Sequence, residues 1–211
     1  MYMLKFKRSI DLLLSSVLII LFLPLMLVIL MILCFTTGGN PIFIQQRAGK
    51  DEKSFLLFKF RTMNGLKTPS GELAEDQFRL TSFGRFLRKS SLDELPQLIN
   101  VLIGDMSLIG PRPLFVKYLG YYYLAEKKRH SIRPGISGWA QVNGRNNANW
   151  DERLKLDIYY VDNLCFRLDM LILYKTVINI ILSKDVVVDE SYLIKDLDEE
   201  RSGNVIDSYG T

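Results

Sequence analysis

Hydrophobic residues first gather in one long run near the start of the chain. Leu12–Phe35 contains no charged residue and is interrupted only by two serines and Pro24. As a helix it would extend about 36 Å, enough to span a hydrocarbon core of about 30 Å. A cleaved signal peptide is disfavoured, because no alanine precedes Ala48 to form the usual small-residue cleavage site. The run therefore predicts a membrane helix.

Basic residues flank this run on both sides, at Lys5, Lys7 and Arg8 before it and at Arg47, Lys50, Lys53, Lys59 and Arg61 after it. Cytoplasmic flanks of membrane segments are enriched in Lys and Arg, so both ends are predicted to face the cytosol. A straight span cannot satisfy both flanks. A bend at Pro24 can, because proline removes a backbone donor and clashes with the preceding turn. We expect a re-entrant helix-break-helix with arms Leu12–Leu23 and Pro24–Phe35; a kinked single span is the alternative.

The remaining pattern predicts short strands followed by helices. The apolar runs 42–47 and 54–61 are typical of a β-hairpin with a turn at 48–53. Gly- and Pro-rich loops are expected at 104–113 and 133–149. Helices are expected at 75–102, with breaks at Gly84 and Ser90–Asp93, and at 114–129, 150–160 and 168–182. The predicted class is mostly α with a short β-hairpin.

Two segments have more than one interpretation. The helix predicted at 168–182 is apolar nearly all round but too short to span a membrane. Tyr118, Tyr121, Tyr122 and Tyr123 crowd together, as aromatic residues do at a membrane–water interface. Core packing is the alternative for both. The predicted architecture is a re-entrant membrane helix joined to a small cytosolic α/β-associated domain with interfacial amphipathic helices.

Charge divides the chain into a basic body and an acidic tail. The 211 residues are 48% hydrophobic and 24% charged, which fits one domain with a membrane anchor. Residues 185–211 hold eight acidic and two basic residues, and we expect a mobile acidic tail there. The predicted divisions are therefore 1–36 for the membrane helix, 37–184 for a membrane-associated catalytic domain and 185–211 for the tail. A basic body favours anionic partners such as phosphoesters, nucleic acid or anionic lipid.

Histidine and cysteine are too scarce for several common kinds of active site. The chain has one histidine, His130, and two cysteines. A zinc site built from Cys and His needs about four ligands, so it is excluded. A serine or cysteine hydrolase would have to use His130, which lies in a basic run without a nucleophile motif. Two cysteines make no disulfide framework, so a reducing compartment is expected.

The sharpest local motif surrounds a pair of carboxylates. In the run 90–98, Pro96 is tolerated only in the first turn of a helix, which places Asp93 at or near the N-cap. Free backbone N–H groups there would keep the pKa of Asp93 at or below about 3.9. Ser91 and Glu94 also fit a capping box, so plain helix capping is the alternative interpretation.

The surroundings of this pair favour chemistry on phosphates. Arg88 lies upstream, and Arg112 stands between Pro111 and Pro113, whose rings stiffen the backbone and present a planar guanidinium to phosphate oxygens. Arg145 lies in a second glycine-rich loop. Carboxylates framed by arginines indicate phosphoryl transfer assisted by Mg²⁺. A P-loop or a Rossmann nucleotide site is not supported, because neither glycine motif is present.

These motifs, taken in order, resemble the bacterial sugar transferase family, and specifically its minimal monotopic phosphoglycosyl transferases. The matching segments are 59–63, 91–97, 104–107, 110–113, 133–146 and 157–160, and the resemblance covers about residues 3–183. It implies transfer of a phosphosugar from a UDP-sugar to polyprenyl (undecaprenyl) phosphate with release of UMP, on the cytoplasmic face of the inner membrane, initiating glycan assembly.

The resemblance also implies roles for single residues. Asp93 would be the nucleophile that forms a phosphosugar-aspartyl intermediate and would bind Mg²⁺. Glu94 would assist at the metal or take the proton of the acceptor. The residues expected to contact substrate are Lys59, which would pair with the acidic site, Arg88, Arg112 and Arg145, which would hold phosphates, and Pro111 and Pro113, which would flank the nucleotide. Arg129 and Arg153 lie outside the motifs, so Arg→Lys changes there are expected to have little effect.

A second hypothesis comes from a different class of protein. A membrane-tethered adaptor could use the basic body to bind anionic lipid, without enzymatic activity. The clustering of rigid Gly/Pro loops around one carboxylate pair disfavours it, because lipid binding does not need them. Nucleic acid is not an expected partner, since the aromatic residues are grouped apart from the arginines. The expected partners are a UDP-sugar, polyprenyl phosphate and the phospholipid bilayer, and a homodimer is one expected assembly.

Overall fold

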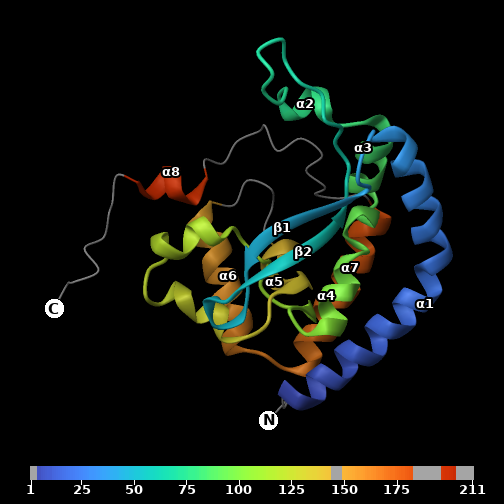
Figure 1. Cartoon of the computed structure of the whole chain (residues 1–211). Helices are drawn as coiled ribbons and strands as arrows, with labels where there is room; N and C mark the ends of the chain where they lie inside the picture. The colour runs from blue at the N-terminus through green and yellow to red at the C-terminus, as the bar shows by residue number, and fades with distance from the viewer. Residues whose placement is uncertain (1–3, 144–148, 183–195, 203–211) are drawn as a thin grey trace.

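The computed structural model describes residues 4–143, 149–182 and 196–202. Helix α1 (Leu4–Thr36) arcs along one side of the body, and a β-hairpin crosses the centre (Figure 1). With η marking 3₁₀ helices, the other elements are β1 (Ile42–Ala48), η1 (Lys50–Glu52), β2 (Ser54–Phe60), α2 (Asp76–Arg79), α3 (Ser82–Lys89), η2 (Leu92–Glu94), α4 (Gln97–Ile103), β3 (Ser107–Ile109), η3 (Val116–Tyr121), η4 (Glu126–Ser131), β4 (Gly135–Ser137), α5 (Trp139–Asn143), α6 (Trp150–Asp162), α7 (Phe166–Ile181) and α8 (Leu197–Arg201).

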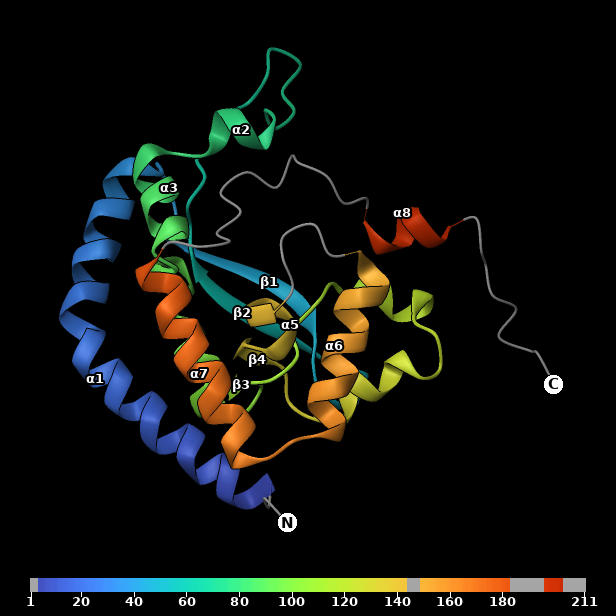
Figure 2. The same ribbon diagram turned by 180° about the vertical axis from the view of Figure 1, so that it is seen from behind.

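The predicted class is confirmed: the described residues are mostly helical, with a short antiparallel hairpin and one long apolar N-terminal helix. Strands β1 and β2 pair antiparallel from Ile42–Phe60 to Ala48–Ser54, as the alternation of their residues predicts. Helices α6 and α7 also occupy the predicted ranges. Figure 2 shows α7 lying beside α1, on the face of the molecule that is turned away from the viewer in Figure 1.

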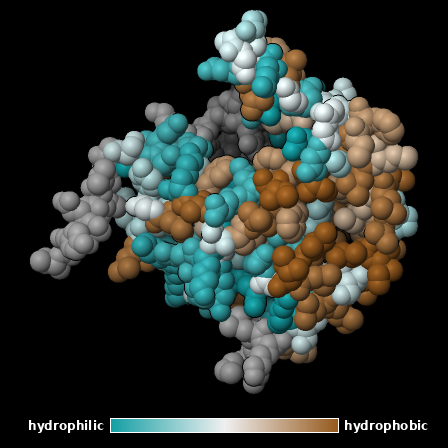
Figure 3. All heavy atoms as spheres, in the orientation of Figure 1, coloured by the Kyte–Doolittle hydropathy of each residue, from teal (hydrophilic) through white to brown (hydrophobic). Residues whose placement is uncertain are grey.

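Helix α1 is continuous through Pro24, so the proline does not break it into two separate helices. Proline removes one backbone hydrogen bond and bends a helix without necessarily ending it. Its segment Phe6–Thr36 is long and apolar enough to cross a membrane by length and composition. Met26, Ile29 and Leu33 are buried against the body, while most other apolar side chains of α1 remain exposed. Figure 3 shows hydrophobic residues gathered on this side of the molecule.

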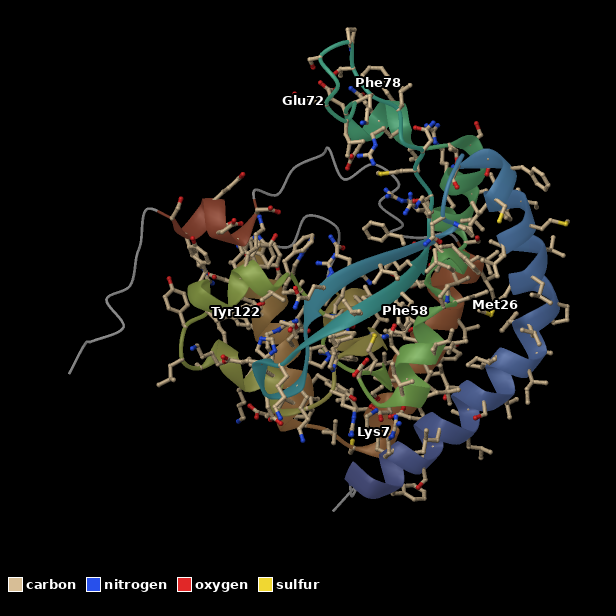
Figure 4. The ribbon with its side chains drawn as sticks, viewed as in Figure 1. Lys7, Met26, Phe58, Glu72, Phe78 and Tyr122 are labelled. Carbon is tan, nitrogen blue, oxygen red and sulfur yellow. The ribbon has the colours of Figure 1, made fainter. Side chains whose placement is uncertain are left out.

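The first turns of α1 are fixed to the body by polar contacts. Lys7 Nζ lies 2.7 Å from Asp169 Oδ2 of α7, and both side chains are buried. Figure 4 shows Lys7 at the start of α1, where the helix approaches the body. Asp11 accepts hydrogen bonds from Ser107 Oγ at 2.8 Å and from the backbone N–H of Leu108 at 3.1 Å. Both the start and the end of α1 therefore pack against one domain.

Two helical predictions are corrected. Segment 114–129 forms the two 3₁₀ helices η3 and η4 instead of one α-helix, and the chain is extended at Tyr122. Tyr118 and Tyr122 are buried in a cluster with Trp150 and Leu154, so core packing overrides local helix propensity here. The break predicted at Gly84 lies instead at residues 80–81, since α3 runs through Gly84. Tyr118 and Tyr122 thus pack in the core, as the alternative to a membrane-interface position predicted.

The acidic tail is ordered where the structure describes it. Residues 197–201 form α8, whose Leu197 is fully buried in the cluster of Tyr118 and Tyr122. The prediction of a mobile end is therefore wrong for residues 196–202, and the rest of the predicted tail lies outside the described residues. The acidic composition favoured solvent, whereas the burial of Leu197 depends on the distant tyrosines of the cluster.

Gly84 should not tolerate a side chain. A Cβ atom there would lie 2.0 Å from the carbonyl oxygen of Thr62, so α3 would have to move away from the segment that follows β2. Gly84→Ala should lower the free energy of unfolding by about 1–3 kcal/mol, as overpacking does. Thermal unfolding measures the change. Gly65→Ala is the control, because nothing lies within 4 Å of its added Cβ; equal melting temperatures for both variants would contradict the packing described.

Candidate functional site

Strand β2 delivers Lys59 to the two carboxylates that follow α3. Lys59 Nζ lies 2.8 Å from Glu94 Oε1 and 3.8 Å from Asp93 Oδ2. The lysine side chain is largely covered, with 21% of it exposed, and the two carboxylates are more enclosed still. Charges held this close with little water interact more strongly than charges on an open surface. The hairpin therefore contributes one cation to a mostly enclosed cluster.

Asp93 and Glu94 lie in the 3₁₀ turn η2, ahead of the next α-helix. Helix α4 begins only at Gln97, after Pro96, and its first turn has no side-chain cap. The predicted N-cap position for Asp93 is therefore wrong. The capping box is absent as well, because the Glu94 carboxylate binds Lys59 instead of turning back to Ser91. Ser91 adopts a left-handed conformation with φ 55°, a strained backbone for a non-glycine residue that turns the chain into the site.

The Pro-Arg-Pro loop brings Arg112 to the same carboxylate. Arg112 Nη2 lies 3.0 Å from Glu94 Oε1, and 45% of the Arg112 side chain is exposed. Pro111 and Pro113 are both buried. The rings therefore pack into the protein while the Arg112 side chain stays half exposed, and the expectation that Pro111 and Pro113 flank a nucleotide stays a prediction. Glu94 thus joins Lys59 of the hairpin to Arg112 of the loop.

The strands β3 and β4 hold the two glycine-rich loops side by side. They pair in parallel, with Ser107 opposite Gly135 and Ile109 opposite Ser137. The chains approach so closely that a Cβ on Gly135 would lie 2.0 Å from the backbone nitrogen of Gly110. Sequence reasoning treated both segments as loops and missed these strands, because runs of three residues carry no readable alternation.

The other predicted site residues divide into two groups. Arg88 of α3 donates from Nε to Thr62 Oγ1 at 3.1 Å, and its positive charge is close enough to Asp93 to oppose part of the rise that burial causes in the pKa of that group. Arg88 therefore belongs to the cluster. Arg145 lies outside the described residues. Five of the predicted residues, which are Lys59, Arg88, Asp93, Glu94 and Arg112, come together in space, with Pro111 and Pro113 beside them.

Two arginines that lie outside the motifs, Arg129 and Arg153, adjoin the site in the folded chain. Buried Arg129 donates from Nη2 to the backbone carbonyl of Arg112 at 2.7 Å and pairs with buried Asp157 at 2.8 Å. The charge of Arg112 lowers the pKa of Arg153, after the larger effect of burial, so this arginine is also near. The small effect expected of Arg→Lys changes at these two positions stays a prediction. The sequence shows Asp157 in the matching segment 157–160, but its burial, which makes a cationic partner necessary, is visible only in the structure.

The two carboxyl groups titrate far apart. Burial, followed by the negative charge of Glu94, raises the pKa of Asp93 to about 6. Burial alone would raise the pKa of Glu94 too, but the charges and hydrogen bonds of Lys59 and Arg112 outweigh it and lower that pKa to about 2. The expectation of an ordinary or lowered pKa for Asp93 is therefore wrong. Near neutral pH both groups are ionised, and Asp93 is the more basic.

The donor set suits a metal that takes few protein ligands. No group of three or more His, Cys, Asp or Glu side chains gathers at one point in the parts of the chain that the structure describes. Glu94 is already engaged by two cations, which leaves Asp93 as the available carboxylate. Mg²⁺ commonly binds through one or two carboxylates, several waters and the phosphates of a substrate. The residues present therefore fit Mg²⁺ that arrives with a phosphate ligand.

Comparison with known proteins adds an independent observation. The sequence model of the family described as "Bacterial sugar transferase" matches residues 2–183. An uncharacterized sugar transferase, EpsL, of Bacillus subtilis is 50% identical over 149 residues, covering 70% of this chain and 74% of the relative. A UDP-N-acetylgalactosamine-undecaprenyl-phosphate N-acetylgalactosaminephosphotransferase of Aeromonas hydrophila is 42% identical, covering 81% of this chain but only 42% of the relative. The exopolysaccharide production protein ExoY of Rhizobium meliloti is 36% identical, covering 84% and 86%.

Replacing Asp93 with asparagine should stabilise the protein in the absence of metal. The pKa of Asp93 is raised to about 6 in the folded state, above about 3.9 for an unfolded aspartate. Ionisation therefore disfavours the folded state as the pH rises through that window. Asp93→Asn removes this cost and should raise the free energy of unfolding by about 1–3 kcal/mol at about pH 7.5 with EDTA.

Thermal unfolding across pH checks this expectation. The gain should vanish at about pH 3.5, where the carboxyl group is largely protonated in both states. A lower melting temperature for Asp93→Asn than for wild type near neutral pH would contradict the raised pKa.

Proposed function

The chain belongs to the bacterial sugar transferase family, and we propose that it transfers a sugar phosphate from a UDP-sugar to a polyprenyl phosphate. The observation that carries the proposal is the enclosed Asp93–Glu94 pair bordered by Lys59, Arg88 and Arg112. Such a site can receive the negative charge of a diphosphate while keeping one carboxylate available for reaction. Relatives named for transfer to undecaprenyl phosphate support the acceptor.

Asp93 acts as the nucleophile in this proposal. Its carboxylate oxygen attacks the phosphorus that carries the sugar, and the bond from that phosphorus to the UMP oxygen breaks. The electron pair leaves with UMP, so this half-reaction needs no proton. An oxygen of polyprenyl phosphate then attacks the same phosphorus and frees Asp93. A pKa of about 6 supports this role, because the group is ionised at neutral pH yet more nucleophilic than an ordinary aspartate.

Glu94 positions cations in this scheme instead of accepting a proton. Its lowered pKa makes it a weak base, and its Oε1 atom already binds Lys59 and Arg112. Because Glu94 binds them, Lys59 and Arg112 can contact the phosphates of the UDP-sugar without forming close ion pairs with Asp93. Arg88 supplies further positive charge beside Asp93, and Arg145 is proposed as a phosphate contact on the family resemblance alone.

Mg²⁺ is the proposed metal, with Asp93 as its ligand from the protein. Bound with the diphosphate, the ion would neutralise charge on the phosphate oxygens and hold them in place. Lys59 and Arg112 orient the UDP-sugar, and Asp93 attacks the phosphorus that carries the sugar. The sugar is not specified, since the relatives are named for N-acetylgalactosamine, glucose and galactose transfer.

The helix α1 is proposed to dip into the cytoplasmic leaflet of the inner membrane and return. Lys7 and Asp11 hold its start to the domain, and Met26 and Leu33 pack its later turns against the same domain. A helix that crossed the bilayer would separate these two regions by about 30 Å of hydrocarbon. The exposed apolar residues of α7, among them Tyr174, Val177 and Ile181, extend this surface toward the lipid.

A burst experiment tests the covalent mechanism. Full-length enzyme mixed with UDP-sugar and Mg²⁺, without acceptor, should release about one UMP per active site and gain the mass of a sugar phosphate, because the first half-reaction is complete in itself. Asp93→Asn should abolish both signals, since an amide is a poor nucleophile. A panel of UDP-sugars is needed to identify the donor.

Intact-protein and peptide mass spectrometry decide the outcome. Lys155→Arg is the control, because Lys155 is exposed on α6 and belongs to none of the motifs; its burst should match wild type. An adduct on a peptide that lacks Asp93 would refute the assignment. Turnover with both substrates but no burst would favour direct displacement, and no UMP release from any donor would overturn the proposed function.

Cysteine labelling tests the re-entrant topology. In a variant with Cys34 and Cys165 replaced by serine, Ser9→Cys and Lys53→Cys should react with a membrane-impermeant reagent from the same, cytoplasmic side. Both positions are exposed on the protein surface. Labelling from opposite sides would show a spanning helix. Pro24→Leu should shift the population toward that spanning form, because the straightened helix fits the bilayer better.

A further inference from the structure

The helix α8 lies outside residues 2–183, the segment that the family model matches, yet it is built into the domain. Leu197 is fully buried in the aromatic cluster formed by Tyr118, Tyr122 and Trp150. Figure 4 shows Tyr122 in the segment that α8 overlies. Burying one leucine side chain contributes about 1.5–3 kcal/mol. The apolar contact therefore holds the helix in place.

Ionic contacts fix the orientation of α8 at both ends. Asp196 lies 2.6 Å from Lys117 Nζ and accepts a hydrogen bond from the Tyr118 hydroxyl at 2.8 Å. At the other end, Arg201 is only 4% exposed and pairs with Glu126 at 2.7 Å and with Asp151 at 2.6 Å. These partners belong to three elements, η3, η4 and α6, so α8 ties all three together.

A continuous set of contacts leads from α8 to the Pro-Arg-Pro loop. Arg201 Nη1 donates to the backbone carbonyl of Tyr121 at 2.8 Å. The next residue, Tyr122, accepts from Arg129 Nη1 at 3.3 Å. Arg129 Nη2 in turn donates to the carbonyl of Arg112 at 2.7 Å. Each contact involves a buried or largely covered group, which limits how far its neighbours can shift.

We propose that α8 is a clamp that positions the Arg112 loop to bind the UDP-sugar. Leu197 and Arg201 are positioning residues in this inference, because neither lies at the carboxylate pair and both act through Tyr121, Tyr122 and Arg129. The inference rests on the proposed function for the identity of the ligand. The clamp itself is a property of the substrate-free protein.

An acidic tail that serves only to keep the protein soluble would not bury its charged residues. Charged residues in such a tail stay hydrated, and burying a guanidinium is unfavourable unless every partner is in place. Arg201 is buried with two carboxylates and a backbone carbonyl, and its guanidinium carbon lies 4.3 Å from the centre of the Tyr123 ring. Such specific contacts support a positional role for the segment.

Two variants of the full-length chain test the clamp. Leu197→Ala removes the apolar anchor, and Arg201→Gln removes the charge that joins η4 to α6. Glu200→Gln is the matched control, because Glu200 is exposed on the same helix. The first readout is hydrogen exchange in the substrate-free protein. Both variants should exchange faster across residues 112–123, and the control should match wild type.

The second readout is steady-state UMP release with a UDP-sugar and polyprenyl phosphate. Each variant should raise the KM for the UDP-sugar about fivefold, within the range of coupling through packed networks. The kcat should stay within about twofold of wild type, because the loop affects donor binding and not the attacking carboxylate. Arg201→Lys keeps the charge but loses the forked contacts, so its KM should fall between those of wild type and Arg201→Gln.

The outcomes separate the clamp from the proposed function. Faster exchange at 112–123 together with a raised KM supports the clamp. A lower melting temperature with unchanged KM would show a structural brace only and would overturn it, as would unchanged exchange at 112–123. If wild type releases no UMP from any donor, the proposed function fails by itself, and an unchanged exchange pattern remains the result that refutes the clamp.

Discussion

One carboxylate organises the centre of this molecule. Oε1 of Glu94 lies 2.8 Å from Lys59 of the hairpin and 3.0 Å from Arg112 of the Pro-Arg-Pro loop. Three segments distant in the sequence therefore meet at one atom. Burial and the negative charge of Glu94 raise the pKa of Asp93, while Lys59 and Arg112 bind Glu94 and lower the pKa of that group. The difference between two adjacent acids comes from which of them the cations bind.

The rest of the fold keeps these partners at the right separation. Close backbone contacts, such as that between Gly110 and Gly135, lock the two glycine-rich loops together and allow no side chain between them. Asp11 of α1 binds the start of β3, the strand that leads into Gly110, so α1 is part of the scaffold that holds these loops. Glycine at these positions loses more conformational entropy on folding than other residues do. In return, the absence of a side chain lets the two loops pack closely and rigidly.

The substrate-free site also carries an intrinsic instability. A carboxylate that is buried beside a second carboxylate disfavours the folded state, and Ser91, two residues before Asp93, has a strained backbone. Packing elsewhere must offset this, and the aromatic cluster around Tyr118 and Tyr122 is one source, extended by Leu197 from the C-terminal segment. Packing far from the carboxylates thus offsets the unfavourable free energy of the buried Asp93 and of the strained backbone at Ser91.

The sequence by itself determined the family, which the match over residues 2–183 confirms, and the long apolar helix, the hairpin and the grouping of Lys59 and Arg112 with the carboxylates. The family, the helix and the hairpin follow from local patterns and from the order of the motifs, whereas the grouping of Lys59 with carboxylates that are distant in the chain follows only from the resemblance to the family. The tertiary structure decided the pKa of Asp93, the link from Arg129 to Arg112 and the docking of α8. Burial and long-range partners set all three, and neither can be read from residues that are neighbours only in sequence.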